Sequence, residues 1–581
     1  MSHRTGRALL APLLAALVAG GGFSSALAAG SAGRAPAPLT SREKALHALN
    51  RLAFGPRPGD VDRVVAMGVS AWIEAQLTPE TIPDPAVAAR LADYPTLAMS
   101  QGEIFDTFER PLQEARRQRR LAAADSPGGT GDAGATAGAA AEEEMRNGIP
   151  PEKRPRRVIE ELSAARVLRA AYSERQANEV LVDFWMNHFN VYAAKGLDRV
   201  LVTSFERDVV RPRIWGRFED LLLATAKSPA MLFYLDNAQS VADPEHRPPP
   251  PARARFFGGP RFGRMQRMES APPENPNATK GGLNENYARE LMELHTLGVD
   301  GGYTQKDVTE LARVLTGWSI DRNEGPGFVF RARVHDAFAK TVLGHVFRAG
   351  GGIEEGETMI RILAHHPATA RHIAFQLCQR LVADEPPPAL VERVARKFLA
   401  ADGDLRQTVH AIVESPEFFD SRYFRAKVKS PLEYVVSAIR AAGGETNARQ
   451  PVLQEIAQMG EPLYLCQPPT GYSDAAAAWV NTGALVARLN FALALAANRL
   501  RGTEVDFAPL VSPEDAADAK KSVAALSKAL FGGELSPATR KSIEKRLENR
   551  GAPADDVSPS PNMQLPMIAG LILGSPEFQR Q

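Results

Sequence analysis

Cysteine is scarce in this chain of 581 residues, which contains only Cys378 and Cys466. One pair in so long a chain excludes a disulfide-rich scaffold of the kind that stabilises small secreted domains. Cys378 falls at an apolar position within an expected helix, and Cys466 precedes the irregular segment Gln467-Pro468-Pro469. Three states remain open for the pair: one disulfide bridge, two buried thiols, or metal ligation.

Long apolar runs are missing after the N-terminal segment, where no stretch approaches the roughly 18 apolar residues of a membrane-spanning helix. We therefore expect no transmembrane segment once the N-terminal signal described below has been removed. Net charge is also close to zero, because 69 Lys and Arg residues face 68 Asp and Glu residues, which leaves +1. We therefore expect neither nucleic acid nor a strongly acidic or basic protein as a partner.

The motifs of several large enzyme classes are absent. The sequence holds no HExxH pair for zinc, no Walker A loop, no GxSxG nucleophile elbow and no Rossmann glycine fingerprint. Metal, cofactor and substrate are therefore all unknown at this stage, and the candidate residues below come from weaker groupings.

The N-terminus has the three parts of a secretory signal. Arg4 and Arg7 supply positive charge, residues 8–18 form a short apolar run, and residues 26–28 (Ala-Leu-Ala) offer a small-residue cleavage pattern. We expect cleavage after Ala28 and a periplasmic or secreted mature protein. An uncleaved membrane anchor is the alternative.

Helix signals follow one another along the rest of the chain, whereas alternating strand patterns are scarce. Residues 40–43, 304–307 and 430–433 each have the spacing of a helix-capping box. We predict a mainly α fold, a large multi-helix body with two long irregular insertions. Its expected parts are a signal peptide (1–28), a linker (29–39), an N-terminal helical region (40–121), a disordered low-complexity insertion (122–157), a helical region (158–241), a Pro/Arg-rich insertion (242–280), a signature region (281–350) and a C-terminal helical region (351–581).

Two expected helices, 284–297 and about 305–317, lie in the signature region, and Gly298 is expected to end the first. His295 falls within the apolar arc of the first helix, so we expect it to be buried. In the C-terminal region, we expect 451–472 to be a long irregular loop and 474–500 a helix.

Several separate segments carry a family resemblance. They include LNRLAFGPRPGDVDRV (49–64), FWMNHFNV (184–191), ENYARELMELHTLGVDGGYTQKDV (285–308), LTGW (315–318) and HPATARHIAFQLCQRLV (366–382). Together they resemble the bacterial domain-of-unknown-function family number 1800, over most of the chain from about Leu46. The resemblance implies a helical architecture and export rather than a mechanism. It also implies a partner, a protein of the sulfatase and alkaline-phosphatase type encoded nearby.

Three short stretches concentrate the groups best suited to proton transfer or ligand binding. They are DFWMNHFN (183–190), the expected helix 284–297, which we call the signature helix, and VHDAFAK (334–340). The candidate catalytic residues are Glu290, Glu293, His188, His335 and Asp336, and the candidate ligand-binding residues are Asn187, Asn286, Arg289 and Lys340. For each of them the alternative is structural: a satisfied core histidine, or a solvated salt-bridged face. His365, His366 and His372 have the wrong spacing for a zinc helix pair, and the first two are more simply capping residues.

Two functional hypotheses follow. The first is an exported helical protein that acts as a binding or assembly component of the cell envelope, together with the sulfatase/phosphatase-like partner. The second is an exported hydrolase that uses the Glu290/Glu293 face with His188 or His335, with or without a metal. An enzyme should gather histidines and carboxylates from distant segments in one partly buried pocket, whereas a scaffold should satisfy them one by one.

Overall fold

The computed structural model describes residues 37–124, 150–248, 282–321, 325–548 and 561–581. The predicted signal peptide and most of both predicted insertions lie outside these residues. Of the described residues, 61% are in helices and 5% in strands, which confirms the predicted mainly α class. None of the helices in these ranges is long and apolar enough to cross a membrane.

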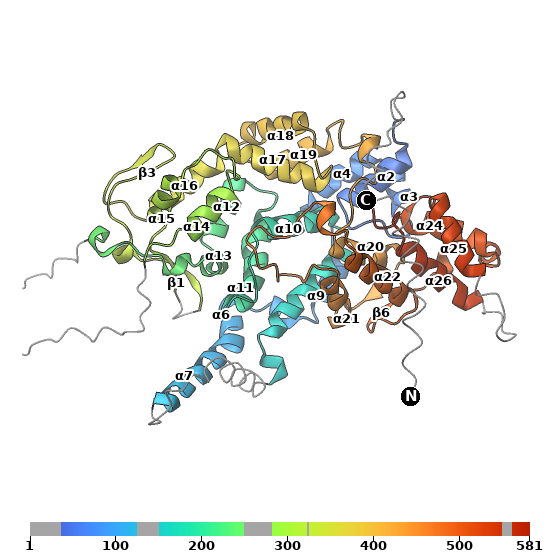
Figure 1. Cartoon of the computed structure of the whole chain (residues 1–581), viewed down its shortest axis with the longest axis horizontal. Coiled ribbons are helices and arrows are strands. Elements are labelled where there is room, and N and C mark those ends of the chain that lie inside the picture. The colour runs from blue at the N-terminus through green and yellow to red at the C-terminus, as the bar shows by residue number, and fades with distance from the viewer. Residues whose placement is uncertain (1–36, 125–149, 249–281, 322–324, 549–560) are drawn as a thin grey trace, which may run out of the picture.

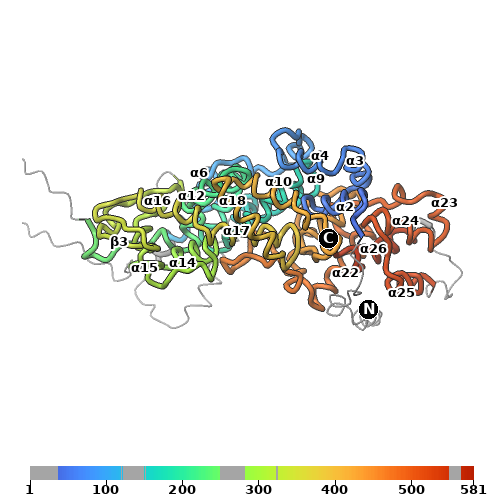
Figure 2. The backbone as a smooth tube through the Cα atoms, turned by 90° about the horizontal axis from the view of Figure 1, so that it is seen from above, coloured from blue at the N-terminus to red at the C-terminus, as the bar shows by residue number. Residues whose placement is uncertain are grey.

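The helices are distributed along one long axis (Figures 1 and 2). One end holds the signature region, whose two hairpins are each made of two antiparallel strands. The elements at this end are α14 (Asn286–Glu293), α15 (Gln305–Val314), β1 (Trp318–Asp321), β2 (Gly327–Phe330), β3 (Lys340–Val342), β4 (His345–Phe347) and, beyond the signature region, α16 (Ile353–Ala364).

The middle of the molecule combines helices from two distant parts of the chain. From the N-terminal half come α6 (Gln101–Ile104), α7 (Arg110–Ala124), α9 (Arg156–Tyr172), α10 (Gln176–His188), α11 (Asp198–Ser204), α12 (Phe218–Ala226) and α13 (Pro229–Tyr234). Beside them lie α17 (Pro367–Leu381), α18 (Pro388–Ala400) and α19 (Leu405–Val413). α11 continues into a π-helical segment, Phe205–Val210.

The other end joins the first described helices to the last (Figure 1). It holds α2 (Ser41–Arg51), α3 (Asp60–Met67), α4 (Val69–Leu77), α5 (Pro85–Leu91), α20 (Pro431–Ala441), α21 (Gln450–Gln458), α22 (Thr482–Ala496), α23 (Pro513–Ala516), α24 (Ala519–Phe531), α25 (Pro537–Glu548) and α26 (Pro561–Leu573). A short hairpin, β5 (Glu445–Thr446) with β6 (Thr503–Glu504), completes it.

A single hydrophobic core runs through the described residues and fixes the positions of these helices. α20 lies deepest, since every one of its residues is buried, and it packs against α9. α9 in turn packs against α10 and α11. Because α9 and α10 are held by packing on several sides, polar side chains that they carry have fixed positions.

The three predicted capping boxes are confirmed at the starts of α2, α15 and α20. His366 also caps α17, because its ring accepts a hydrogen bond from the Ala368 N–H. Both cysteines are free and buried, so the state with two buried thiols is the one observed.

The signature helix is shorter than predicted. It ends at Glu293, because the N–H groups of both Leu294 and His295 donate to the Glu290 carbonyl and the backbone then turns more widely. Gly298 has the left-handed backbone expected of a stop residue, with φ 80°, but it stands beyond the end of the helix. The neighbouring α15 likewise ends at Val314 rather than Gly317.

The region predicted to be one long loop contains α21, so only its second part is irregular. Pro451 stands in the first turn of α21, and the buried Val452 and Ile456 are one helical turn apart. That local pattern was sufficient to predict a helix. The following helix begins at Thr482, capped by Asn481, rather than at residue 474.

Three edges of the predicted insertions are ordered. α7 extends to Ala124, inside the range 122–157. Pro151–Lys153 form a 3-10 turn and α9 begins at Arg156, inside the range 122–157. Pro244–His246 form another 3-10 turn, inside the range 242–280. The remaining residues of the two insertions lie mostly outside the described ranges.

Candidate functional site

His188 lies at the end of α10 and is buried. Its Nδ1 is 2.8 Å from the Gln376 side-chain oxygen, and its Nε2 is 3.3 Å from the His295 carbonyl. Burial, followed by the nearby His295 and His372, lowers its pKa well below the ordinary value. His188 is therefore a neutral, hydrogen-bonded ring in the core.

His295 is buried as predicted, with 1% of its surface exposed. Its ring centroid lies 5.1 Å from that of Phe189. Burial lowers its pKa to about 3, and its Nε2 has no hydrogen-bond partner among the described residues. The ring is thus held in the core in its neutral form.

The candidates on α14 make mainly local contacts. Arg289 is 3.4 Å from Glu285 and donates to Gln305 at 2.9 Å. Glu293 accepts from the Tyr303 hydroxyl at 3.3 Å, while the Asn286 amide donates to the Leu235 carbonyl at 3.4 Å. Burial and the neighbouring Glu293 raise the pKa of Glu290.

His335, Asp336 and Lys340 are brought together with Arg313 and Glu355, and we call these five residues the signature cluster. Asp336 accepts from Arg313 at 2.9 and 3.0 Å. Lys340, fully buried, donates to Glu355 at 2.7 Å, and His335 Nε2 is 3.3 Å from the same Glu355 oxygen. Burial acts to raise the pKa values of Asp336 and Glu355, but the partners outweigh it and lower both.

His188, the α14 carboxylates and the signature cluster thus have three separate sets of hydrogen-bond partners. Among the described residues, no direct hydrogen bond or ion pair joins His188 to Glu290 or to His335. A shared site between them remains a prediction.

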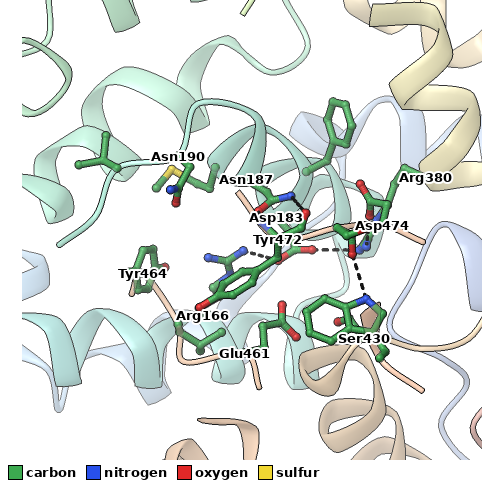
Figure 3. Close-up of a pocket in the computed structure, with 16 residues that line it drawn as sticks. Arg166, Asp183, Asn187, Asn190, Arg380, Ser430, Glu461, Tyr464, Tyr472 and Asp474 are labelled. Atoms are coloured by element: carbon green, nitrogen blue, oxygen red, sulfur yellow. Dashed lines mark hydrogen bonds and ion pairs between the residues drawn. The ribbon is translucent and has the colours of Figure 1, made fainter. Parts of the chain in front are cut away.

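A pocket that carries more unusual chemistry opens between α9, α10, α17 and the loop between α21 and α22, residues 459–481 (Figure 3). The atom-free space between its walls is about 580 Å³ when the open solvent at its mouth is counted, and about 40 Å³ of it can hold the centre of a water molecule. Five acidic or basic residues line it: Arg166, Asp183, Arg380, Glu461 and Asp474. Two amides, Asn187 and Asn190, and four aromatic rings, Phe184, Tyr464, Tyr472 and Trp479, complete most of the wall.

Four of these charged groups form one connected network (Figure 3): Arg166, Asp183, Arg380 and Asp474. Asp183 lies between two guanidinium groups, paired with Arg166 and with Arg380, the latter at 3.0 Å. Arg380 also contacts Glu433 at 3.0 Å and Asp474 at 3.2 Å. One buried arginine thus holds three carboxylates from three different segments, and such pairing is what permits charge inside a protein.

Glu461 differs from the other carboxyl groups of the pocket. One of its oxygens accepts the Leu432 N–H at 2.8 Å, and no cationic group of the described residues lies within 4 Å of it. Burial, and then the negative charge of Asp183, raises its pKa to about 7. Burial also raises the pKa of Asp474, although Arg380 and Lys427 oppose this.

Two asparagines hold the loop 459–481: Asn187 of α10, and Asn190 just beyond the end of that helix. The Asn187 amide donates to the Tyr472 carbonyl at 2.7 Å and accepts the Tyr472 N–H at 2.7 Å. Asn190 donates to the Cys466 and Pro468 carbonyls at 3.0 and 2.8 Å. Gly471, with φ 68°, allows this approach, because a Cβ there would lie 2.5 Å from the Asn187 oxygens. Asn187 therefore lines the pocket and also holds its loop.

Tyr464 fixes the other side of the same loop. It has a left-handed backbone, φ 61°, which is unusual for a bulky side chain and costs on the order of 1 kcal/mol or more. Its hydroxyl donates to Glu206, and the Arg166 guanidinium lies 5.1 Å from the centre of its ring. Burial acts to raise the pKa of Glu206, but three arginines, led by Arg211, lower it to about 2. The wall of the pocket is therefore preorganised by buried ionic contacts.

Of the candidates from sequence, only Asn187 lines this pocket. Arg166, Arg380, Glu461 and Asp474 were missed, because each stands alone in its segment. Asp183 carries the one usable local signal, since it is an acid within the apolar run Val180 to Trp185 and is buried. A charged residue in such a run needs a partner from elsewhere.

Metal-binding geometry is scarce in the described part of the chain. Glu74, His410 and Glu414 form the single group of three ligand atoms close enough to hold an ion there, and both carboxylates are exposed. The two ring nitrogens of His410 each face a different carboxylate, at 3.0 Å. This surface group has the contacts of ordinary ion pairs.

Comparison with protein families confirms the resemblance that the separate sequence segments indicated. The family model described as "Protein of unknown function (DUF1800)" matches residues 47–580. This chain belongs to the DUF1800 family. No curated protein and no solved structure matches it. For this DUF1800 protein the pocket itself must therefore carry the functional argument.

Proposed function

We propose that this DUF1800 protein is an exported binding component of the cell envelope, which takes a small polar ligand into the pocket between α9, α10, α17 and loop 459–481. One observation carries the proposal: ionised side chains from distant segments are fixed by buried contacts around an opening. A preorganised polar pocket loses little conformational entropy when a ligand binds.

The distribution of histidines favours binding over hydrolysis. No histidine of the described residues lines the pocket. Instead His188, His335 and His372 each contact a backbone carbonyl, at 3.3, 2.8 and 3.0 Å respectively. This is the pattern expected of structural histidines, and the carboxyl groups of the pocket converge without one.

Export and the partner complete the proposal. The three-part N-terminal signal supports export, and sequencing of the mature protein is expected to begin at Ala29. The sulfatase/phosphatase-like partner is supported by the family resemblance, and affinity purification of the exported protein with its genomic neighbours tests it.

The binding function is tested by closing the pocket. Ser473 is exposed at its rim, so Ser473→Trp fills the mouth without disturbing the core. Thr470→Trp, on the same loop but outside the lining, is the matched control. Ligand-observed NMR with a panel of small amines, alcohols, sugars and carboxylates should identify compounds that bind the original protein.

These compounds should no longer bind the Ser473→Trp variant and should still bind the Thr470→Trp control. If the whole panel fails to bind, or if both tryptophan variants bind equally well, the pocket is not a binding site.

A further inference from the structure

The pocket contains more acidic groups than basic ones. Among its lining residues, Asp183, Glu461 and Asp474 face only Arg166 and Arg380. Arg380 is further shared with Glu433, which lies behind the wall. Lys427, also behind the wall, acts to lower the pKa of Asp474 but is paired with Asp384. Among the residues that line the pocket, acidic groups therefore outnumber cations by three to two.

Glu461 is the carboxyl group of the pocket that has no cationic partner among the described residues. It is 6% exposed, borders the open space, and forms no ion pair among the described residues. Asp183, by comparison, is paired with two arginines. A buried carboxylate without a counter-ion is unfavourable, so it either keeps its proton or acquires a cation. Burial raises the pKa of Glu461, so this carboxyl group keeps its proton more readily than an exposed one does.

The aromatic part of the wall suits a cation as well. The rings of Tyr472 and Trp479 lie 6.0 Å apart, and both face the pocket beside the acidic groups. Aromatic faces attract ammonium and guanidinium groups, and the Arg166 guanidinium already lies near the Tyr464 ring. A ligand with a cationic head could contact carboxyl groups on one side and rings on the other.

We propose that the pocket is selective for small organic cations, whose ammonium or guanidinium group binds Glu461 and Asp474 while an apolar part packs against Tyr472 and Trp479. This inference rests on the binding function proposed above and names its ligand class. The ligand supplies the positive charge that the wall lacks.

Three probes of nearly equal shape and different charge test the inference: benzylamine, benzyl alcohol and benzoate. Their affinities for the full chain are measured by titration calorimetry at pH 8, where the amine is protonated and Glu461 ionises most readily. Benzylamine should bind about ten-fold more tightly than benzyl alcohol, and benzoate more weakly than either.

Two variants test whether the preference for the amine depends on Glu461. Glu461→Gln should reduce the preference for the amine over the alcohol to within about two- to three-fold, since it removes the unpaired carboxylate. Glu455→Gln, on α21 and outside the lining, should leave the preference unchanged. Thermal melting of both variants checks that they fold, and the comparison of probes on the unaltered chain does not depend on any variant.

The other outcomes separate the two proposals. Equal affinities for the amine and the alcohol, both lost in Ser473→Trp, would overturn cation selectivity and leave the binding function standing. If benzoate binds most tightly, cation selectivity is overturned, and the pocket instead recognises anions through Arg166. If no probe binds, or if Ser473→Trp binds as well as Thr470→Trp, both the inference and the binding function fail.

Discussion

The signature cluster and the pocket both contain buried charge, but they differ in how completely that charge is neutralised. In the signature cluster, Lys340 and Arg313 each contact a carboxylate within 3 Å. In the pocket, Arg380 is divided among three carboxylates and Glu461 has no cation within 4 Å among the described residues. Incomplete pairing beside an opening is the feature expected of a binding site, and in these two regions only the pocket combines the two.

Lys340→Met, in the signature cluster, should have the largest effect. It leaves Glu355 and Asp336 buried without their ammonium partner, so the free energy of unfolding should fall by about 3–5 kcal/mol. Chemical denaturation measures the loss. Lys306→Met, exposed on α15, is the control and should stay within about 0.5 kcal/mol of the original protein. If the two variants are equally stable, the signature cluster is not the structural unit described above.

Glu461→Gln should raise the free energy of unfolding at pH 8, whereas Lys340→Met should lower it. The pKa of Glu461 is raised from 4.5 to about 7 in the folded chain, so the folded state holds a proton that the unfolded state has already lost. The stability contributed by this proton is complete below pH 4.5 and is lost as pH rises through 7. Glutamine is neutral throughout, so the variant should be more stable than the original at pH 8, by about 2–3 kcal/mol.

Denaturation at pH 8 and at pH 4 checks this result, because the gain should vanish at the lower pH. Other titratable and charged groups act on Glu461 from the elements around it, and their contributions are common to both proteins: Asp183, Arg166, Cys466, Tyr472 and Arg488. A variant that is less stable than the original at pH 8 would contradict the unpaired state of Glu461.

His295→Ala should lower the free energy of unfolding at pH 7 by about 1–3 kcal/mol, because a buried ring is removed from beside Phe189. The pKa of His295 is about 3 in the folded chain against 6.5 for an exposed ring, so the unfolded state takes up its proton first on acidification. The stabilisation by neutral His295 is complete above pH 6.5 and is lost as pH falls towards 3.

The difference between the original protein and His295→Ala should therefore narrow between pH 7 and pH 4.5. Thermal melting across this range measures it. A constant difference would mean that His295 does not titrate with folding.

Asn187→Ala should have the smallest global effect, about 1 kcal/mol, since it removes two hydrogen bonds to one backbone position. Its local effect should be clear, because loop 459–481 loses its attachment to α10. Hydrogen exchange of the Tyr472 amide should become faster. Asn178→Ala, on the same helix but bonded to Trp215, should leave that amide unchanged. Unaltered exchange in both variants would show that the loop is held by other contacts.

Local features of the fold were predictable because their causes are local. The Thr304–Asp307 capping box needs only four consecutive residues, and the burial of His295 follows from its place among apolar neighbours. The predicted end of the signature helix, at residue 297, was wrong because the wider turn at Glu290 leaves no short-range signal before Gly298. α21 was missed although Pro451 and the Val452–Ile456 spacing indicated it.

Most of the pocket could not be predicted, because its contacts join residues that are far apart in the sequence. Arg380 alone suggests a surface or ion-paired residue, and only the folded chain brings it to Asp183. Asn187 was selected as a ligand-binding residue for its neighbours in sequence, and it does line the pocket. Its two bonds to Tyr472, however, depend on a contact that no local pattern encodes.

The distances along the chain that separate the pocket residues have a consequence for biosynthesis. Asp183 and Arg380 are 197 positions apart, and Asn187 and Tyr472 are 285 apart. Contacts between such remote positions form late, because long loops must close before the contacts stabilise anything. During synthesis, Asp183 can meet Arg166 early, but its second partner, Arg380, emerges only after most of the chain has been made. The pocket is therefore a marker of completed folding, and a chain stalled before residue 474 would contain most of the helices but no complete pocket.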